Sequence, residues 1–137
     1  MRVRIGPYRK NQAKNIEIEP FDTWSMDYTL ALIVYPMLVQ LKDTTHGAPN
    51  VDDEDVPEEL RSTNASPKDN EWDTDEYWFK RWDWVLDQMI YSFKYKADDV
   101  CLYLNFKPEE KEAMNNEQDR ISNGFRLFGK YYENLWD

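Results

Sequence analysis

Apolar residues recur at helical spacing in three stretches of the chain, which predict helices at about 23–43, 74–96 and 110–134. Apolar side chains cover most of the circumference of the first stretch, so we expect it to be the central core helix. The stripe of the second stretch is formed by Trp78, Trp82, Val85, Leu86, Met89, Ile90 and Phe93. The third stretch carries a stripe at Ile121, Phe125, Phe128 and Tyr132. The pattern predicts a mainly α fold, a compact three-helix bundle.

The N-terminal residues 1–20 have a different periodicity, in which apolar and charged residues alternate. Val3-Arg4-Ile5 and Ile16-Glu17-Ile18 predict a short β-hairpin. Two strands alone are marginally stable in water, so one face of the hairpin should pack on the helices. The segment 98–106 fits a strand or a helix, and an α+β fold is the alternative to the mainly α one.

The connection between the first two helices, residues 43–70, is long and rich in Gly, Pro, Asn, Ser and acidic residues. Loops of this length are usually functional or disordered, and antiparallel helices need only about 2 to 8 connecting residues. We expect an ordered flap that Val51, Val56 and Leu60 anchor on the helices. The flap is the first candidate for a functional surface.

Composition places the chain among single-domain proteins, since 137 residues with 41% hydrophobic content can form one core over residues 1–137. The 27 acidic and 17 basic residues give a net charge of −10, which repels nucleic acids and anionic membranes and favours a basic partner. Direct nucleic-acid binding and membrane binding are therefore not expected. The single Cys101 excludes an intramolecular disulfide, and the expected location is cytoplasmic.

Several segments resemble a family of small bacteriophage proteins of uncharacterised activity. The resemblance is carried by MRVRIGPY (1–8), DTWSMD (22–27), HGAP (46–49), VDDEDVP (51–57) and RISNGFRLFGKYY (120–132). It implies a viral protein in the cytoplasm of an infected bacterial host, and it implies no particular chemistry.

One candidate site is a divalent-metal centre in the flap. His46, the only histidine, precedes Asp52, Asp53 and Asp55, and imidazole and carboxylates are ligands for ions such as Mg²⁺ or Mn²⁺. A metal-dependent hydrolase would use these four residues. The competing interpretation is a solvated acidic loop that binds no cofactor.

A second candidate site lies around the aromatic cluster of the second helix. An indole can stack on a nucleobase while a nearby cation meets a phosphate. The candidate ligand-binding residues are Trp78, Lys80, Arg81, Trp82, Arg120 and Arg126. In the competing interpretation the indoles build the core, and Lys80 and Arg81 keep their charged heads in water.

Recognisable catalytic motifs are absent from the sequence, which favours binding over catalysis. We therefore expect a phage-encoded, non-enzymatic binding protein that inhibits a host protein or sequesters a host nucleotide signal. The alternatives are the metal-dependent hydrolase and an acidic mimic of nucleic acid. Self-association is left open.

Overall fold

The computed structural model describes residues 1–6 and 15–137 and confirms a mainly α fold with a short β-hairpin. Strand β1 (Arg2–Arg4) pairs antiparallel with β2 (Asn15–Glu17), in a register that sets Val3 opposite Ile16. The turn expected between the strands lies largely outside the described residues. The helices are α1 (Met26–Thr44), α2 (Trp78–Ala97), α3 (Leu102–Asn105) and α4 (Lys111–Lys130). The three long helices therefore match the sequence prediction to within a few residues at each end.

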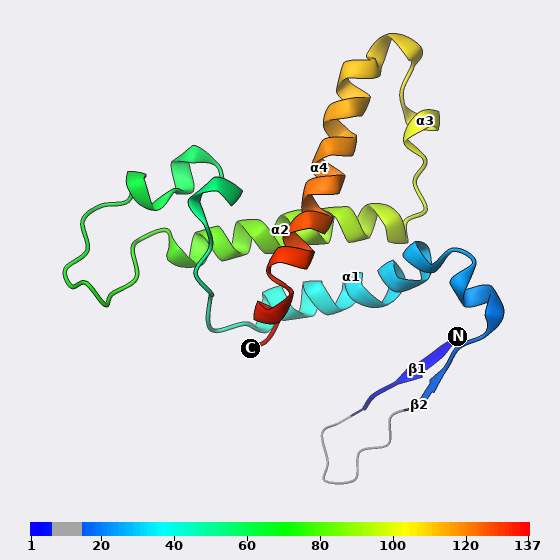
Figure 1. The fold of residues 1–137 in the computed structure, drawn as a ribbon, viewed down its shortest axis with the longest axis horizontal. Helices are drawn as coiled ribbons and strands as arrows, with labels where there is room; N and C mark the ends of the chain where they lie inside the picture. The colour runs from blue at the N-terminus through cyan, green and yellow to red at the C-terminus, as the bar shows by residue number, and fades with distance from the viewer. Residues whose placement is uncertain (7–14) are drawn as a thin grey trace.

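Helix α2 occupies the centre of the fold, with α1 packed on one side of it and α4 crossing it on another (Figure 1). Eight of its residues are buried: Arg81, Trp82, Val85, Leu86, Gln88, Met89, Ser92 and Phe93. Helix α1 buries only Ala31 and Leu38. The expectation that the first helix is the central one is wrong, because α2 packs against both α1 and α4, whereas the extensive helical contact of α1 is with α2.

The crossing of α2 and α4 depends on a glycine. A Cβ at Gly124 would lie 1.9 Å from the Ser92 Oγ atom and 2.4 Å from the Gln88 carbonyl oxygen. The Ser92 hydroxyl donates a hydrogen bond of 2.7 Å to the Ile121 carbonyl oxygen, so this polar group is satisfied inside the interface. Beside this contact the Phe93 ring packs edge-on against the rings of Phe125 and Phe128.

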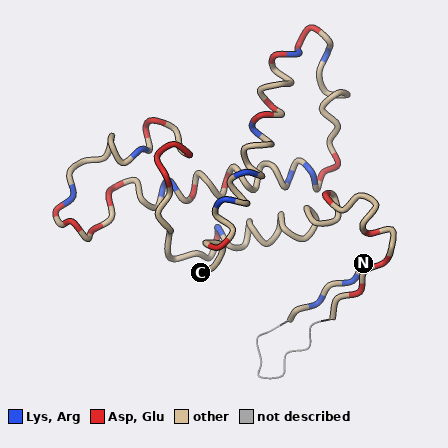
Figure 2. Tube along the Cα trace, viewed as in Figure 1, with Lys and Arg blue, Asp and Glu red and all other residues tan. Residues whose placement is uncertain are grey.

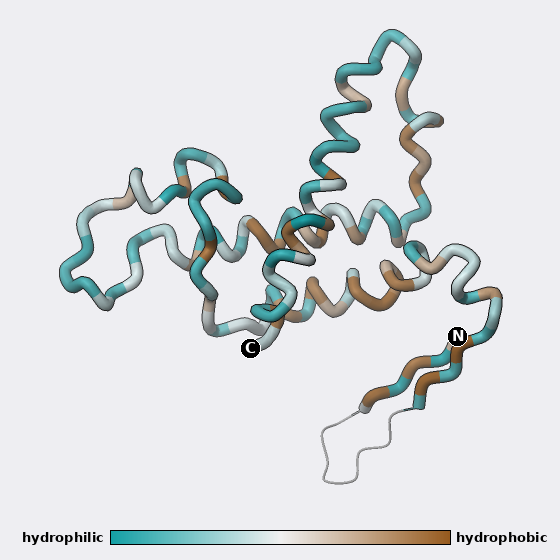
Figure 3. Tube along the Cα trace, in the orientation of Figure 1, coloured by the Kyte–Doolittle hydropathy of each residue, from teal (hydrophilic) through white to brown (hydrophobic). Residues whose placement is uncertain are grey.

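The hairpin is not packed on the helices as expected. Its apolar side chains remain exposed, at 39% for Val3, 48% for Ile5, 53% for Ile16 and 63% for Ile18. Figure 1 shows the two strands standing clear of the helices near the N-terminal end of α1. Figure 3 shows that apolar positions lie along both strands and along α1. Val3, Ile16 and Ile18 therefore leave apolar surface exposed to solvent.

The flap between α1 and α2 is ordered and attached to the core, as predicted. It contains three short 3-10 helices, η2 (Asp53–Asp55), η3 (Glu58–Leu60) and η4 (Ser62–Asn64). Val51 and Val56 are buried in the core cluster, and Leu60 packs against it. The flap therefore contributes to the hydrophobic core as well as to the surface.

The ambiguous segment 98–106 forms no strand and contains the short helix α3, in which Leu102 is buried. Within the described residues, none of the helices is long and apolar enough to cross a membrane.

Replacing Trp82 by Ala should destabilise the fold by about 3 to 5 kcal/mol, because its indole is 2% exposed and packs edge-on against Tyr131. Chemical denaturation measures the change in the free energy of unfolding. Trp72→Ala is the matched control, since that indole is 84% exposed and its removal should change stability by less than about 0.5 kcal/mol. Equal stabilities of the two variants would contradict the burial of Trp82.

Gly124→Ala and Gly129→Ala should shift stability in opposite directions, although both glycines lie in α4. An added methyl group at 124 has to push α2 and α4 apart, at a cost of about 1 to 3 kcal/mol or more. A methyl group at 129 meets nothing within 4 Å and should stabilise the helix by up to about 1 kcal/mol. Thermal melts of the two variants test the crossing, and a stabilised Gly124→Ala variant would reject it.

Candidate functional site

The negative charge of the protein is concentrated in one part of the chain. Residues 43–76, which we call the acidic segment, contain 12 of the 27 acidic residues and two of the 17 basic ones. The net charge of this segment is −10, equal to that of the whole chain, so the rest of the protein is balanced. Figure 2 shows acidic positions gathered along the connection between α1 and α2. The connection is therefore the most strongly charged surface of the molecule.

A buried arginine attaches the acidic segment to α2. The Arg81 guanidinium is 2% exposed and forms two hydrogen bonds with the Asp75 carboxylate, at 2.9 and 2.6 Å. It also donates to the Leu60 carbonyl oxygen at 3.1 Å. These hydrogen bonds from Arg81 hold the pKa of Asp75 below its usual value, against the opposing effect of burial. The charged head of Arg81 therefore lies in the interior, bound to Asp75, whereas the competing interpretation of the sequence placed it in water.

A second ionic cluster attaches the acidic segment to α4. Asp55 is 5% exposed and accepts hydrogen bonds from Arg126 at 2.8 Å, Lys130 at 2.5 Å and the Tyr131 hydroxyl at 2.7 Å. Burial opposes ionisation of Asp55, but these hydrogen bonds outweigh it and keep the pKa of its carboxyl below the usual value. Burial and the bond to Asp55 raise the pKa of Tyr131 to about 12. The cluster thus favours a charged Asp55 beside a neutral Tyr131.

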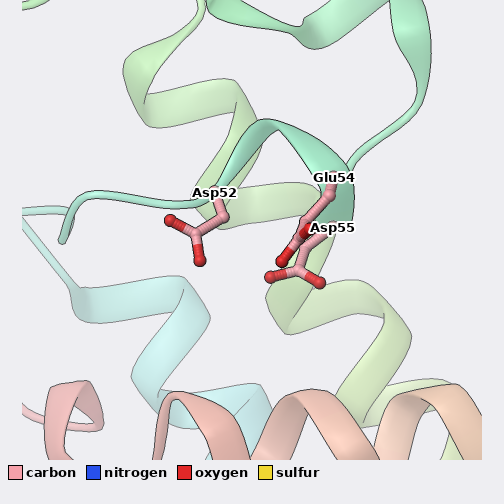
Figure 4. A group of neighbouring side chains, drawn as sticks. All are labelled: Asp52, Glu54 and Asp55. Carbon is pink, nitrogen blue, oxygen red and sulfur yellow. The ribbon is translucent and has the colours of Figure 1, made fainter.

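The structure brings together two of the four predicted metal ligands, Asp52 and Asp55, and places Glu54, which was not predicted, beside them. Carboxylate oxygens of Asp52, Glu54 and Asp55 lie within 4.8 Å of one another (Figure 4). The Lys130 ammonium lies 2.8 Å from Asp52, 3.4 Å from Glu54 and 2.5 Å from Asp55. The positive charge of Lys130 partly neutralises the three carboxylates, which weakens the attraction of the carboxylates for a metal ion.

The other two predicted ligands lie elsewhere. The His46 Nδ1 atom lies 3.3 Å from the Asp137 carboxylate, and its backbone N–H donates to the same side chain at 2.8 Å. Asp53 accepts hydrogen bonds from the backbone and hydroxyl of Ser62. The metal-dependent hydrolase stays a prediction, and the His46 imidazole, one of its four predicted ligands, is turned toward Asp137 and away from the carboxylate cluster.

The predicted ligand-binding residues have separate protein partners. The Trp78 indole N–H donates to the Ala48 carbonyl oxygen at 3.1 Å, and Trp82 is buried in the core. Lys80 lies over the Tyr77 ring. Arg120 donates to Gln88 and stacks at 3.6 Å on the Tyr91 ring.

Arg126, the remaining candidate, pairs with Asp55 as described above. Neither the groove lined by Val34, Met37 and Phe128 nor the pocket lined by Ser66, Asp69 and Glu76 has any of the six candidates in its lining. The indoles thus build the scaffold, as the competing interpretation held.

Sequence reasoning missed Trp72, which lies in the acidic segment between Glu71 and Asp73 and is 84% exposed. The sequence did contain a signal, because Trp72 has acidic neighbours on both sides and belongs to no apolar stripe. The exposed acidic residues of the segment include Glu58, Glu59, Asp69, Glu71, Asp73 and Glu76. Across residues 1–6 and 15–137, none of these six forms an ion pair with a lysine or arginine.

Comparison with known proteins gives no relative from which a role could be transferred. The chain matches no family model, no curated protein and no solved structure.

Asp55→Asn should destabilise the protein by about 2 to 3 kcal/mol at pH 7, because it leaves Lys130 and Arg126 without their buried counter-charge. The expected loss is smaller than for a fully buried pair, since both cations are partly exposed. Glu54→Gln is the matched control, and its 78% exposed side chain should contribute less than about 0.5 kcal/mol. Urea denaturation of both variants gives the comparison.

The contribution of Asp55 also has a defined pH dependence. Because its pKa is lower in the folded state, its stabilisation is complete above the ordinary aspartate pKa of about 3.9 and disappears as pH falls through the lowered value. The stability difference between the native chain and Asp55→Asn should therefore shrink below about pH 4. A difference that stays constant down to pH 2 would mean that this carboxylate is not stabilised by the cluster.

Proposed function

We propose that the protein is a phage-encoded, non-enzymatic binding protein that acts in the cytoplasm of an infected bacterium and inhibits a host protein through a basic surface of that protein. The observation that carries the proposal is that the acidic segment holds the whole net charge of the chain and also contains the exposed Trp72. The phage origin rests on the sequence resemblance alone.

The two features have complementary roles in binding. Unpaired carboxylates on one surface attract a positively charged partner from a distance and raise the association rate. An exposed indole supplies contact area, and tryptophan is among the residues that most often dominate binding energy at interfaces. The acidic segment therefore offers both steering and an anchor.

The candidate phosphate-binding cations of this chain already have protein partners, which favours a protein over a nucleotide as the binding partner. Arg81 and Arg126 are engaged by Asp75 and Asp55, so a phosphate would have to displace carboxylates that are already in place. Arg120 is stacked on Tyr91. These contacts support inhibition of a host protein more than sequestration of a host nucleotide.

A mimic of nucleic acid is a narrower form of the same proposal, in which the basic surface is a nucleic-acid-binding groove of the host protein. The carboxylates would then stand in for phosphates. Duplex DNA added to the complex would compete with the acidic segment for that groove.

Immobilised native protein should capture a basic protein from bacterial lysate, and Trp72→Ala should reduce the capture about tenfold or more. Trp136→Ala is the matched control, because its indole is 72% exposed and lies outside the acidic segment. Capture should fall steeply between 0.1 and 0.5 M salt, since exposed charges are screened over shorter distances. A partner retained equally by the Trp72→Ala variant and at high salt would refute binding through the acidic segment.

A further inference from the structure

The outer face of α1 carries an apolar stripe that no described residue covers completely. Met26, Leu30, Ile33 and Met37 follow one another at intervals of four, three and four residues, which places them on one side of the helix. We call these four residues the outer stripe. Met26 is 53%, Leu30 43% and Met37 63% exposed, while Ile33 is half-buried. A helix that is apolar on all sides normally has partners on all sides.

The intervals of the outer stripe, four, three and four residues, are the same from either end of the helix. If a second α1 lies antiparallel to the first, Met26 faces the second Met37, and Leu30 faces the second Ile33. A two-fold interface requires such a self-complementary patch. No charged residue belongs to the outer stripe, so the pairing brings no like charges into direct contact.

A groove of about 560 Å³ adjoins the C-terminal half of α1. It lies between α1 on one side and the C-terminal end of α4 with the residues that follow it on the other, and its apolar lining includes Met37, Leu41, Phe128, Tyr132 and Leu135. The hairpin, with its own exposed apolar face, lies near the opposite, N-terminal end of α1 (Figure 1). The hairpin and the groove of one chain are therefore at different ends of the same helix.

We propose that two copies of this chain form a two-fold symmetric dimer through antiparallel outer stripes, with strands β1 and β2 of each copy seated at the groove of the other. The antiparallel arrangement moves each hairpin to the C-terminal end of the other α1, where the groove is open. The exposed apolar side chains of α1, of Val3, Ile16 and Ile18, and of the groove are then buried together.

Charge favours a second copy as the occupant. By sequence, residues 1–20, which include both strands, contain five basic residues against two acids, Glu17 and Glu19. The groove end of α1 leads directly into the acidic segment at Asp43, and the acidic residues Glu133 and Asp137 lie at the nearby C-terminus. A basic hairpin arriving at an acidic groove end is electrostatically complementary. The dimer surface is separate from Trp72, so the dimer proposal and the host-binding proposal fail independently.

Sedimentation equilibrium of the native chain should give twice the chain mass of 16.6 kDa at micromolar concentration. Met26→Lys and Met37→Glu should each weaken dimerisation roughly 30-fold or more, because each buries an unpaired charge in the interface. Both side chains are exposed in one copy, so the helical signal should be unchanged. Leu104→Glu, an 85% exposed position away from α1, is the matched control and should stay dimeric.

Mixing the two charge variants tests the direction of pairing. Met26→Lys in one copy faces Met37→Glu in the other only when the helices are antiparallel, so the equimolar mixture should recover a dimer. Ile18→Glu, just beyond β2, should weaken the dimer about tenfold if the hairpin lies at the acidic groove end of the other copy. A monomeric native chain, dimeric single variants or a mixture that stays monomeric would overturn the antiparallel dimer, and a native-like Ile18→Glu dimer would overturn the seating of the hairpin.

Discussion

Ion pairs between the helices and the acidic segment hold the most highly charged part of the protein onto its apolar core. The segment carries a net charge of −10, and its carboxylates repel one another. Arg81 on α2 and Lys130 on α4 offset this repulsion at Asp75 and Asp55, whose side chains are 11% and 2% exposed. A buried charge is tolerated only when it is paired and hydrogen-bonded. These two attachments act together with the buried Val51 and Val56 to hold the acidic segment on the core, while its exposed carboxylates face water.

Much of the fold could be predicted from local patterns, but the identity of the central helix could not. Periodicity located α1, α2 and α4 because each has an apolar stripe. It also ranked α1 as the most buried, since α1 is apolar on most sides. Burial depends on neighbours, and α2 has two because Gly124 permits α4 to approach it at Ser92. That contact joins residues 32 positions apart, and no local pattern reveals it.

At the candidate site, too, the sequence indicates some features and not others. Arg81 follows Trp78 by three residues and precedes Val85 by four, so its position on the apolar stripe could have indicated burial and a paired carboxylate. The sequence could not show which of the 12 carboxylates in the acidic segment is the partner, because that depends on the path of the flap. Likewise, His46 is near Asp52 in sequence, but the flap turns it toward Asp137 at the other end of the chain.

The distribution of charge also determines how two copies could pair through α1. Outside the acidic segment, the remaining 15 acidic and 15 basic residues balance, so the outer stripe belongs to a part of the protein without net charge. Helix α1 has 19 residues and is about 28 Å long. Antiparallel helices would hold the two acidic segments at opposite ends, separated by several Debye lengths of about 8 Å at physiological salt. Parallel helices would set the two segments side by side and bring their charges into repulsion. The same acidic segment that attracts a basic partner therefore favours the antiparallel orientation over the parallel one.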